Sequence, residues 1–237
     1  MNQHSTNTYV LVAGAWHGAW VWRDIIPALR ALGHTVSAPT LTGLGERRHN
    51  ATHDTGLGTH IEDVVAHIEM ENLDAVTLVG WSYGGMVIAG VASRLPGKVK
   101  SMIYLDAFVP ENGKALVDYI PTENRARLEV FVSEGKPIPA FPLEVFGITD
   151  PVLVDYITPR LAPQPWLTFF EPVQLQPLRE GIAVSYVYCQ GYVGSAFGHF
   201  YEQFKNDPNV RTAVLDTSHH CMLLDPLATL ETLVNLG

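Results

Sequence analysis

Short apolar runs rich in β-branched residues alternate along the chain with segments of helical spacing. The runs lie at residues 9–13, 35–38, 75–79, 100–105, 182–188 and 210–215. Two of them, YVLVA and TLVG, are continuously apolar, which is typical of strands that helices bury on both faces. The alternation therefore predicts an α/β fold with parallel central strands flanked by helices.

Two of the intervening segments carry signals for helix starts. Residues 59–72 have helical apolar spacing, and Thr59 with Glu62 predicts a capping box at their beginning. Asp225 followed by Pro226 predicts the start of the last helix. The expected apolar face of that helix consists of Leu227, Leu230, Leu233 and Val234.

Residues 110–180 interrupt the alternation. They hold eleven of the sixteen prolines, and proline fixes φ and removes a backbone donor, so long regular elements are not expected there. Their large aromatic side chains need burial or a ligand. We therefore expect residues 110–180 to form an inserted cap of short helices, and residues 1–109 and 181–237 to form the core.

The composition is that of one folded, globular domain. The chain has 237 residues, of which 47% are hydrophobic and 16% are charged, so it is too apolar for a disordered protein. Its net charge of -9, without a basic cluster, disfavours binding to the phosphate backbone of nucleic acids.

Three further features of the sequence indicate the cellular compartment of the protein. No apolar run approaches the roughly 20 residues needed to cross a bilayer. The first eight residues carry no Lys or Arg, unlike the start of a secretory signal. Cys189 and Cys221 are too few for a disulfide framework or a four-cysteine metal site. We expect a cytoplasmic protein that binds neither membrane nor nucleic acid.

A candidate nucleophile lies between a predicted strand and a predicted helix. The sequence GWSYGGM follows the run TLVG, so that Gly80, Ser82 and Gly84 form the pattern G-x-S-x-G. The motif alone is common by chance. At a sharp strand-to-helix turn, however, it lifts a serine hydroxyl above the sheet. We interpret Ser82 as a nucleophile rather than a structural turn serine.

A serine hydroxyl becomes an effective nucleophile when a neighbouring base takes its proton. The sequence DTSHHCMLLDP, after the last predicted strand, offers His219 and His220 side by side. Only one of two adjacent side chains is expected to face the serine. We favour His219 as the base and interpret His220 as a surface or supporting imidazole.

The third member of a serine triad is a buried carboxylate that fixes the tautomer of the histidine. The loop after the next-to-last predicted strand, its usual place, contains no Asp or Glu before Glu202. Asp106 ends the preceding strand and can approach the same histidine from a neighbouring loop. We therefore favour Asp106 over Glu202, Asp207 and Asp216.

Acyl transfer also requires backbone amides directed at the developing oxyanion. The positions after the nucleophile and after the first strand assign this role to the N–H groups of Tyr83 and Ala15. Three tryptophans, Trp16, Trp81 and Trp166, are candidates for the substrate pocket.

Five motifs extend over nearly the whole chain: GAWHGAW, PTLTGLGER, GWSYGGM, YLDAFVPENG and SHHCMLLDP. Together they resemble the α/β-hydrolase superfamily, in particular its small cofactor-free branch of bacterial esterases, plant methylesterases and hydroxynitrile lyases. The resemblance implies an α/β-hydrolase fold with about six parallel strands and no cofactor. It also implies hydrolysis of carboxylic esters or, as in some bacterial members, of carbamate esters such as carbendazim.

The sequence departs from this family at four positions. Ala13 and Trp81 stand where family members usually carry histidines before the first-loop glycine and before the nucleophile. Members that cleave cyanohydrins carry a threonine in the first loop and a lysine after the catalytic histidine, where this sequence has Gly14 and His220. The lack of that cation favours hydrolysis over lyase chemistry.

We therefore expect a serine hydrolase that cleaves a small or medium uncharged carboxylic or carbamate ester through an acyl-enzyme. The alternatives are a ligand-binding receptor on the same fold with little turnover, and a carbon–carbon lyase of the hydroxynitrile type. The expected partner is a small-molecule ester, and a homodimer is an open alternative to a monomer. No metal site is expected from the spacing of the histidines between residues 49 and 67.

Overall fold

The computed structural model describes residues 6–192 and 197–237. Its sheet is built from β1 (Thr8–Val12), β2 (Thr35–Ser37), β3 (Val76–Trp81), β4 (Val99–Leu105), β5 (Ala183–Cys189) and β6 (Val210–Leu215). Neighbouring strands are parallel, in the order β2-β1-β3-β4-β5-β6. Each predicted run matches one strand to within two residues at either end. The predicted fold class is confirmed.

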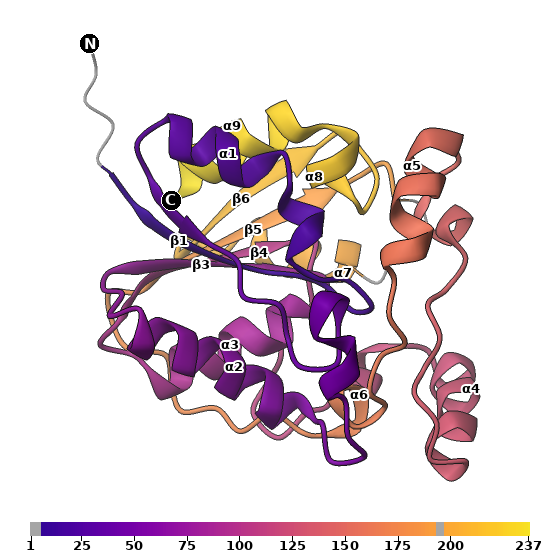
Figure 1. Cartoon of the computed structure of the whole chain (residues 1–237). Helices are drawn as coiled ribbons and strands as arrows, with labels where there is room; N and C mark the ends of the chain where they lie inside the picture. Colours follow the sequence, from indigo (N-terminus) through magenta and orange to yellow (C-terminus); the bar gives the residue numbers. More distant parts are fainter. Residues whose placement is uncertain (1–5, 193–196) are drawn as a thin grey trace.

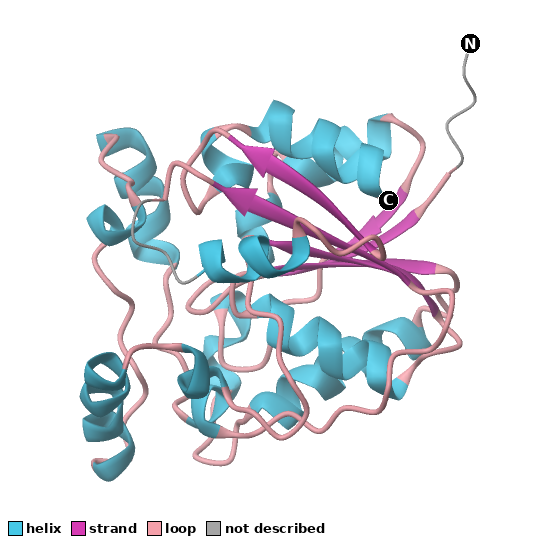
Figure 2. Ribbon diagram, turned by 180° about the vertical axis from the view of Figure 1, so that it is seen from behind, coloured by secondary structure: helices cyan, strands magenta, loops and turns pink. Residues whose placement is uncertain are grey.

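Helices cover both faces of the sheet, as Figures 1 and 2 show from opposite sides. One face packs against α1 (Ile25–Ala31), α8 (Cys221–Leu224) and α9 (Pro226–Leu236). The other face packs against α2 (Leu57–Met70), α3 (Gly84–Arg94) and α7 (Phe197–Phe204). Successive residues of β1 point into the two cores in turn, since Val10 and Val12 join one cluster while Tyr9 and Leu11 join the other. This burial on both sides explains the continuously apolar strands.

The start of α9 is as predicted, and so is most of its apolar face, since Leu230, Leu233 and Val234 pack against the core. Asp225 accepts a hydrogen bond from the Ala228 amide (3.0 Å), and Pro226 is the first helical residue. Leu227, expected on the apolar face, is 66% exposed. The residues of α9 that are buried are Thr229, Leu233 and Leu236.

The start of α2 differs from the predicted capping box. The helix begins at Leu57, and Thr59 accepts a hydrogen bond from the Gly56 amide (3.2 Å) instead of capping the helix itself. The amide of Gly58 donates to Glu171, which lies 113 residues further along the chain (2.9 Å). The prediction was wrong because a distant carboxylate satisfies the first turn, and local sequence carries no signal for it.

Residues 110–180 connect β4 to β5 and contribute no strand to the sheet. They contain α4 (Thr122–Ser133), α5 (Pro151–Ile157) and α6 (Leu167–Phe170), with 3-10 turns between them. Figure 1 shows α4 and α5 beside the end of the sheet. The segment therefore lies next to the loops that follow the carboxyl ends of the strands, where open α/β sheets bind ligands.

Three hydrogen bonds fasten this segment to the loop after β1. The Trp16 amide donates to Gln164 Oε1 (2.8 Å), and its indole N–H donates to the Ile138 carbonyl (3.1 Å). The Trp16 carbonyl accepts from the Ala162 amide (3.0 Å). Trp16 has a φ of 66°, an unusual value for a residue with a side chain, and these bonds hold it there.

No helix within residues 6–192 or 197–237 combines the length and the hydropathy required of a membrane span.

Candidate active site

Ser82 lies at the sharp turn between β3 and α3. Its φ of 56° is in the left-handed region, which residues with a side chain seldom adopt. The Ser82 amide donates to the Leu105 carbonyl (3.3 Å), and the Ser82 carbonyl accepts from the amides of Gly85 (3.1 Å) and Phe108 (3.2 Å). The strand, turn and helix expected around the G-x-S-x-G motif are therefore present.

The two glycines of the motif are required because backbones approach closely at this turn. A Cβ on Gly80 would lie 2.6 Å from the carbonyl oxygen of Gly84. A Cβ on Gly84 would lie 2.7 Å from the carbonyl oxygen of Val12. Both distances are shorter than real carbon–oxygen contacts, so any side chain at these positions would force the strand and the helix apart.

His219 and Asp106 form a buried pair. Nδ1 of His219 lies 2.7 Å from Oδ2 of Asp106, and their side chains are 3% and 0% exposed. Oδ1 of Asp106 accepts a hydrogen bond from the Cys189 amide (3.1 Å). Because an ionised carboxylate only accepts hydrogen bonds, Nδ1 carries the proton and Nε2 is left as the basic nitrogen.

Aromatic rings fix the orientation of the His219 imidazole. The Phe197 ring stacks on it, with centroids 4.9 Å apart and planes within 8° of parallel. Trp81 lies on another side at 5.0 Å, and its indole N–H donates to the His219 carbonyl (2.8 Å). The imidazole is therefore held by packing as well as by Asp106.

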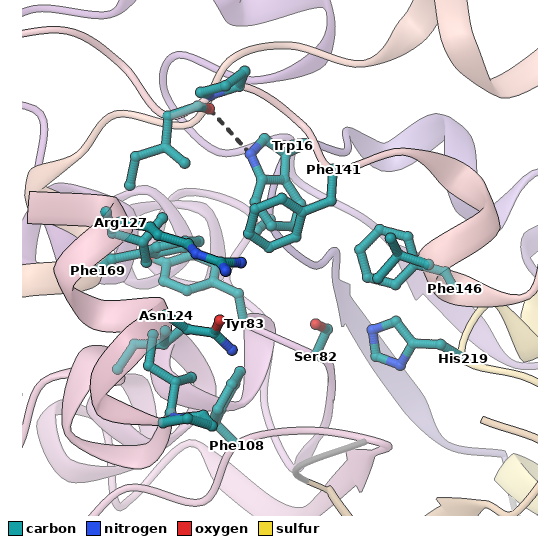
Figure 3. A pocket seen from close by; sticks show the side chains of 18 of the residues that line it. Trp16, Ser82, Tyr83, Phe108, Asn124, Arg127, Phe141, Phe146, Phe169 and His219 are labelled. Carbon is teal, nitrogen blue, oxygen red and sulfur yellow. Dashed lines mark hydrogen bonds between the residues drawn. The ribbon is translucent and has the colours of Figure 1, made fainter. Parts of the chain in front are cut away.

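Ser82 and His219 line the same pocket, which has a volume of about 670 Å³. Figure 3 shows the two side chains next to each other in its wall. Ala15 and Tyr83 also line this pocket, and within the described residues no hydrogen bond occupies their backbone amides. The structure thus brings the sequence-predicted serine, histidine and amide positions to one cavity, with Asp106 behind the histidine.

The other carboxylates that the sequence left open lie elsewhere. Glu202 is solvent-exposed and forms an ion pair with Lys205. Asp207 accepts hydrogen bonds from Asn209 in the turn before β6, and Asp216 accepts one from Gln190. Among the described carboxylates, Asp106 is the one that contacts His219.

Of the three tryptophans suggested for the pocket, Trp16 lines it, whereas Trp81 and Trp166 lie outside its lining. Trp81 is buried behind His219, and Trp166 packs against His53 and Phe170. The prediction for these two is corrected, because the pocket wall comes largely from side chains of residues 110–180 whose spacing carries no periodic signal.

His220 turns away from the pocket and pairs with His17. The Nε2 atoms of the two buried rings are 3.1 Å apart, and Nδ1 of His17 lies 2.6 Å from the Ala15 carbonyl. Since a carbonyl only accepts, Nδ1 of neutral His17 donates to Ala15, and Nε2 of His17 accepts from His220. The pair links the loop of His219 to the loop of Ala15. His17 belongs to the motif GAWHGAW, but nothing in the sequence indicates that it pairs with His220.

Another buried histidine supports the turn that carries Ser82. His60 is 0% exposed, and its Nδ1 lies 2.9 Å from the Tyr83 hydroxyl. Its Nε2 lies 2.8 Å from the Thr42 carbonyl, so this nitrogen donates and Nδ1 accepts from Tyr83. Burial lowers the pKa of His60 to about 4. Within the described residues, no group of three or more His, Cys, Asp or Glu side chains is arranged to hold a metal ion.

The buried neutral histidines predict a loss of stability in mild acid. Burial lowers the pKa of His17 to about 4 and that of His220 well below its ordinary value. The unfolded chain binds these protons at pH values near 6.5, whereas the folded chain, including His60, does not bind them until about pH 4 or below. The free energy of unfolding should therefore fall as the pH falls through this window, by up to about 1.4 kcal/mol per pH unit for each histidine.

Urea unfolding at pH 7.0, 6.0, 5.0 and 4.5 measures this loss. His53→Gln is the matched control, because the His53 side chain is 70% exposed. This substitution should leave the dependence of the unfolding free energy on pH unchanged. A free energy of unfolding that stays level between pH 6.5 and 5 would show that these imidazoles are not neutral in the fold.

The chain matches the model of the Alpha/beta hydrolase family over residues 9–232. It belongs to the alpha/beta hydrolase family. This alpha/beta hydrolase is 38% identical to the carbendazim hydrolyzing esterase of Nocardioides sp. (strain SG-4G), over 97% of its own length and 99% of that protein. The resemblance inferred from the five motifs is confirmed, and the chain is an enzyme.

The chain is also similar to a plant lyase over part of its length and to a bacterial hydrolase of known structure. The chain is 39% identical to the Alpha-hydroxynitrile lyase of Arabidopsis thaliana, but over only 44% of its own length and 40% of the lyase. Its structure is similar to that of an extracellular alpha/beta-hydrolase from a Paenibacillus species, with a TM-score of 0.85 and 25% identity over 98% and 99% of the two chains. These two proteins, the carbendazim hydrolyzing esterase and the Paenibacillus hydrolase, are similar over nearly the whole chain, whereas the similarity to the lyase covers less than half of it.

Proposed function

We propose that the protein is a serine esterase. In the first step Oγ of Ser82 attacks the ester carbonyl while Nε2 of His219 takes the hydroxyl proton. Asp106 stabilises the imidazolium, and the amides of Ala15 and Tyr83 donate to the oxyanion. The imidazolium then protonates the leaving alcohol, which departs as the carbonyl re-forms. Water, deprotonated by His219, next adds to the acyl-enzyme, and Ser82 leaves with the proton returned by His219.

The observation that carries this proposal is the arrangement of Ser82, His219 and Asp106. Ser82 and His219 face one cavity, and the 2.7 Å bond to Asp106 assigns the basic nitrogen of His219 to Nε2. The left-handed turn at Ser82 and the unoccupied amides beside it support the same chemistry. The N-terminus of α3 directs its partial positive charge toward this turn.

The pocket wall supports an ester whose reacting part is uncharged and partly aromatic. Most of the lining side chains are apolar, including Phe131, Phe141, Phe146 and Phe169. A volume of about 670 Å³ suits a small or medium ester. Carboxylic esters are our first choice, and carbamate esters are the alternative that the 38% identity to the carbendazim hydrolyzing esterase suggests.

We also propose that residues 110–180 act as the cap of the site, with residues 1–109 and 181–237 as the catalytic core. More than half of the lining residues belong to this segment. The bonds from Trp16 to Gln164 and Ile138 join it to the loop that carries Ala15. A cap fixed in this way excludes water from the ester and positions it over Ser82.

Labelling with a fluorophosphonate, followed by peptide mapping, tests the nucleophile. We expect a single adduct on Ser82, because this reagent phosphonylates serines that a neighbouring base activates. An unlabelled protein, or an adduct on another residue, would contradict the proposal.

The same preparation separates the two alternatives. Steady turnover of a p-nitrophenyl ester favours an enzyme of this type, whereas a single burst without further turnover favours a receptor with little turnover. Release of cyanide from mandelonitrile would favour a lyase. We expect none, because His220 occupies the position of the lyase lysine and is 0% exposed and bonded to His17.

A further inference from the structure

The pocket has one polar region that the proposed chemistry does not use. Its lining contains Asn124 and Arg127 of α4, in a wall that is otherwise apolar apart from the groups around Ser82 and the hydroxyl of Tyr192. The two residues are three apart on the helix and therefore share one face of it. Figure 3 shows both side chains reaching into the pocket, with Ser82 between them and His219 in this view.

Arg127 is a cation without a counter-ion. Within the described residues its guanidinium forms neither an ion pair nor a hydrogen bond, and no Asp or Glu lines the pocket. Arg125, on another side of α4, is instead paired with Asp118 (2.8 Å) and Glu129 (3.1 Å). The same helix thus carries one arginine that is paired with two carboxylates and one whose donors are free.

Arg127 and Asn124 are solvent-exposed, so they lie at the mouth of the pocket rather than in its buried part. A guanidinium has five N–H donors and no acceptor, and the Asn124 amide adds two further donors. This set of donors matches a carboxylate, which arginine can bind through two parallel hydrogen bonds.

We infer that the preferred substrate is a half-ester: an ester that carries a free carboxylate at the end opposite the bond that is cleaved. The inference rests on the proposed function. The ester and the apolar or aromatic spacer enter the part of the pocket lined by phenylalanines, and the carboxylate stays at the mouth against Arg127 and Asn124. The single charge remains hydrated on its outer side, which is compatible with an apolar interior.

Two esters of one ring test the inference. Monomethyl terephthalate and dimethyl terephthalate differ by one methyl group, and only the first carries a carboxylate at neutral pH. The variants are Arg127→Gln, and Arg125→Gln as the matched control on the same helix. The measurement is kcat/KM for both esters, with circular dichroism to verify that each variant is folded.

We expect Arg127→Gln to lower kcat/KM for the monomethyl ester by about fivefold to tenfold, and to change that for the dimethyl ester by less than about twofold. Arg125→Gln should change neither value. Raising the salt concentration from about 0.05 M to 0.5 M should reduce the preference of the wild type, because salt screens exposed ion pairs.

Two failures can be told apart. If Arg127→Gln leaves the ratio of the two kcat/KM values unchanged while the dimethyl ester is still hydrolysed, the carboxylate inference is overturned and the serine esterase proposal stands. If neither ester is hydrolysed and the fluorophosphonate does not label Ser82, the serine esterase proposal fails and the inference fails with it.

Discussion

Ser82→Ala is expected to lower the turnover of an ester by on the order of 10⁴ or more while leaving the protein folded. Alanine keeps the Cβ of the serine and with it the backbone of the turn, whose φ is 56°. It removes the oxygen proposed to form the acyl-enzyme, so the remaining rate would come from binding and from the proposed oxyanion contacts of the Ala15 and Tyr83 amides. Steady-state kinetics and a thermal unfolding midpoint measured on the same preparation separate a lost nucleophile from a lost fold.

The control for this substitution is another serine. Ser133→Ala removes an exposed hydroxyl whose hydrogen bond, to the Val130 carbonyl, lies at the end of α4. It should leave turnover and the unfolding midpoint unchanged. If Ser82→Ala retained a tenth or more of the wild-type rate, Ser82 would not be the nucleophile, and the whole proposed reaction would have to be rebuilt around another group.

The strands could be predicted from sequence because their signal is local. Strands buried on both faces, such as β3, read as continuous apolar runs, and each of the six predicted runs, including those at the edges, matches a strand of the sheet. The start of α9 could be predicted for the same reason, since its signal consists of two adjacent residues: Asp225 caps the helix and Pro226 is its first residue. The start of α2 could not be predicted, because Glu171, from a distant segment, accepts the hydrogen bond of a backbone amide in its first turn.

In the candidate site, too, some features could be predicted from local sequence and others depend on the fold. Ser82 could be singled out because its motif demands a particular turn from the residues on either side of it. The partnership of His219 with Asp106 required the parallel topology, since 113 residues separate them along the chain. Their chemical roles remain predictions. What the structure adds is that the two side chains form a short hydrogen bond beside the pocket of Ser82.

The supporting contacts could not be predicted, because each joins segments with no shared sequence pattern. Gln164 fixes the amide of Trp16 from 148 residues away, and His220 reaches His17 across 203 residues. The pocket position of Arg127 depends on how α4 lies beside the sheet. Contacts of this kind depend on how distant segments pack in three dimensions, and they produce no periodic pattern in the sequence.

These contacts have a common consequence for the proposed reaction. The buried pair of His17 and His220 joins the loop of the proposed base to the loop of Ala15, and Gln164 joins that loop to residues 110–180. A proton transfer and an oxyanion contact both depend on positions held to a fraction of an ångström. The network therefore supports the relative placement of groups that arise from three separate parts of the chain.

Asp106→Asn is expected to lower turnover by on the order of 10⁴ with the fold retained. Asparagine tolerates the left-handed backbone at this position, where φ is 44°, and its side-chain oxygen can still accept the hydrogen bond from the Cys189 amide. Its NH₂ group would then face Nδ1 of His219, which must become an acceptor. The proton moves to Nε2, and the nitrogen that should take the proton of Ser82 no longer has a free lone pair.

Three matched substitutions show whether this effect belongs to Asp106 alone. Asp216→Asn, Asp207→Asn and Glu202→Gln remove the carboxylates that the sequence left as alternatives, and each should leave kcat within about twofold of wild type because none of them contacts His219. An unfolding midpoint close to that of the wild type is expected for Asp106→Asn as well. An Asp106→Asn enzyme with an undiminished rate would mean that His219 reaches its reactive tautomer without this carboxylate, and the 2.7 Å bond between them would then be structural only.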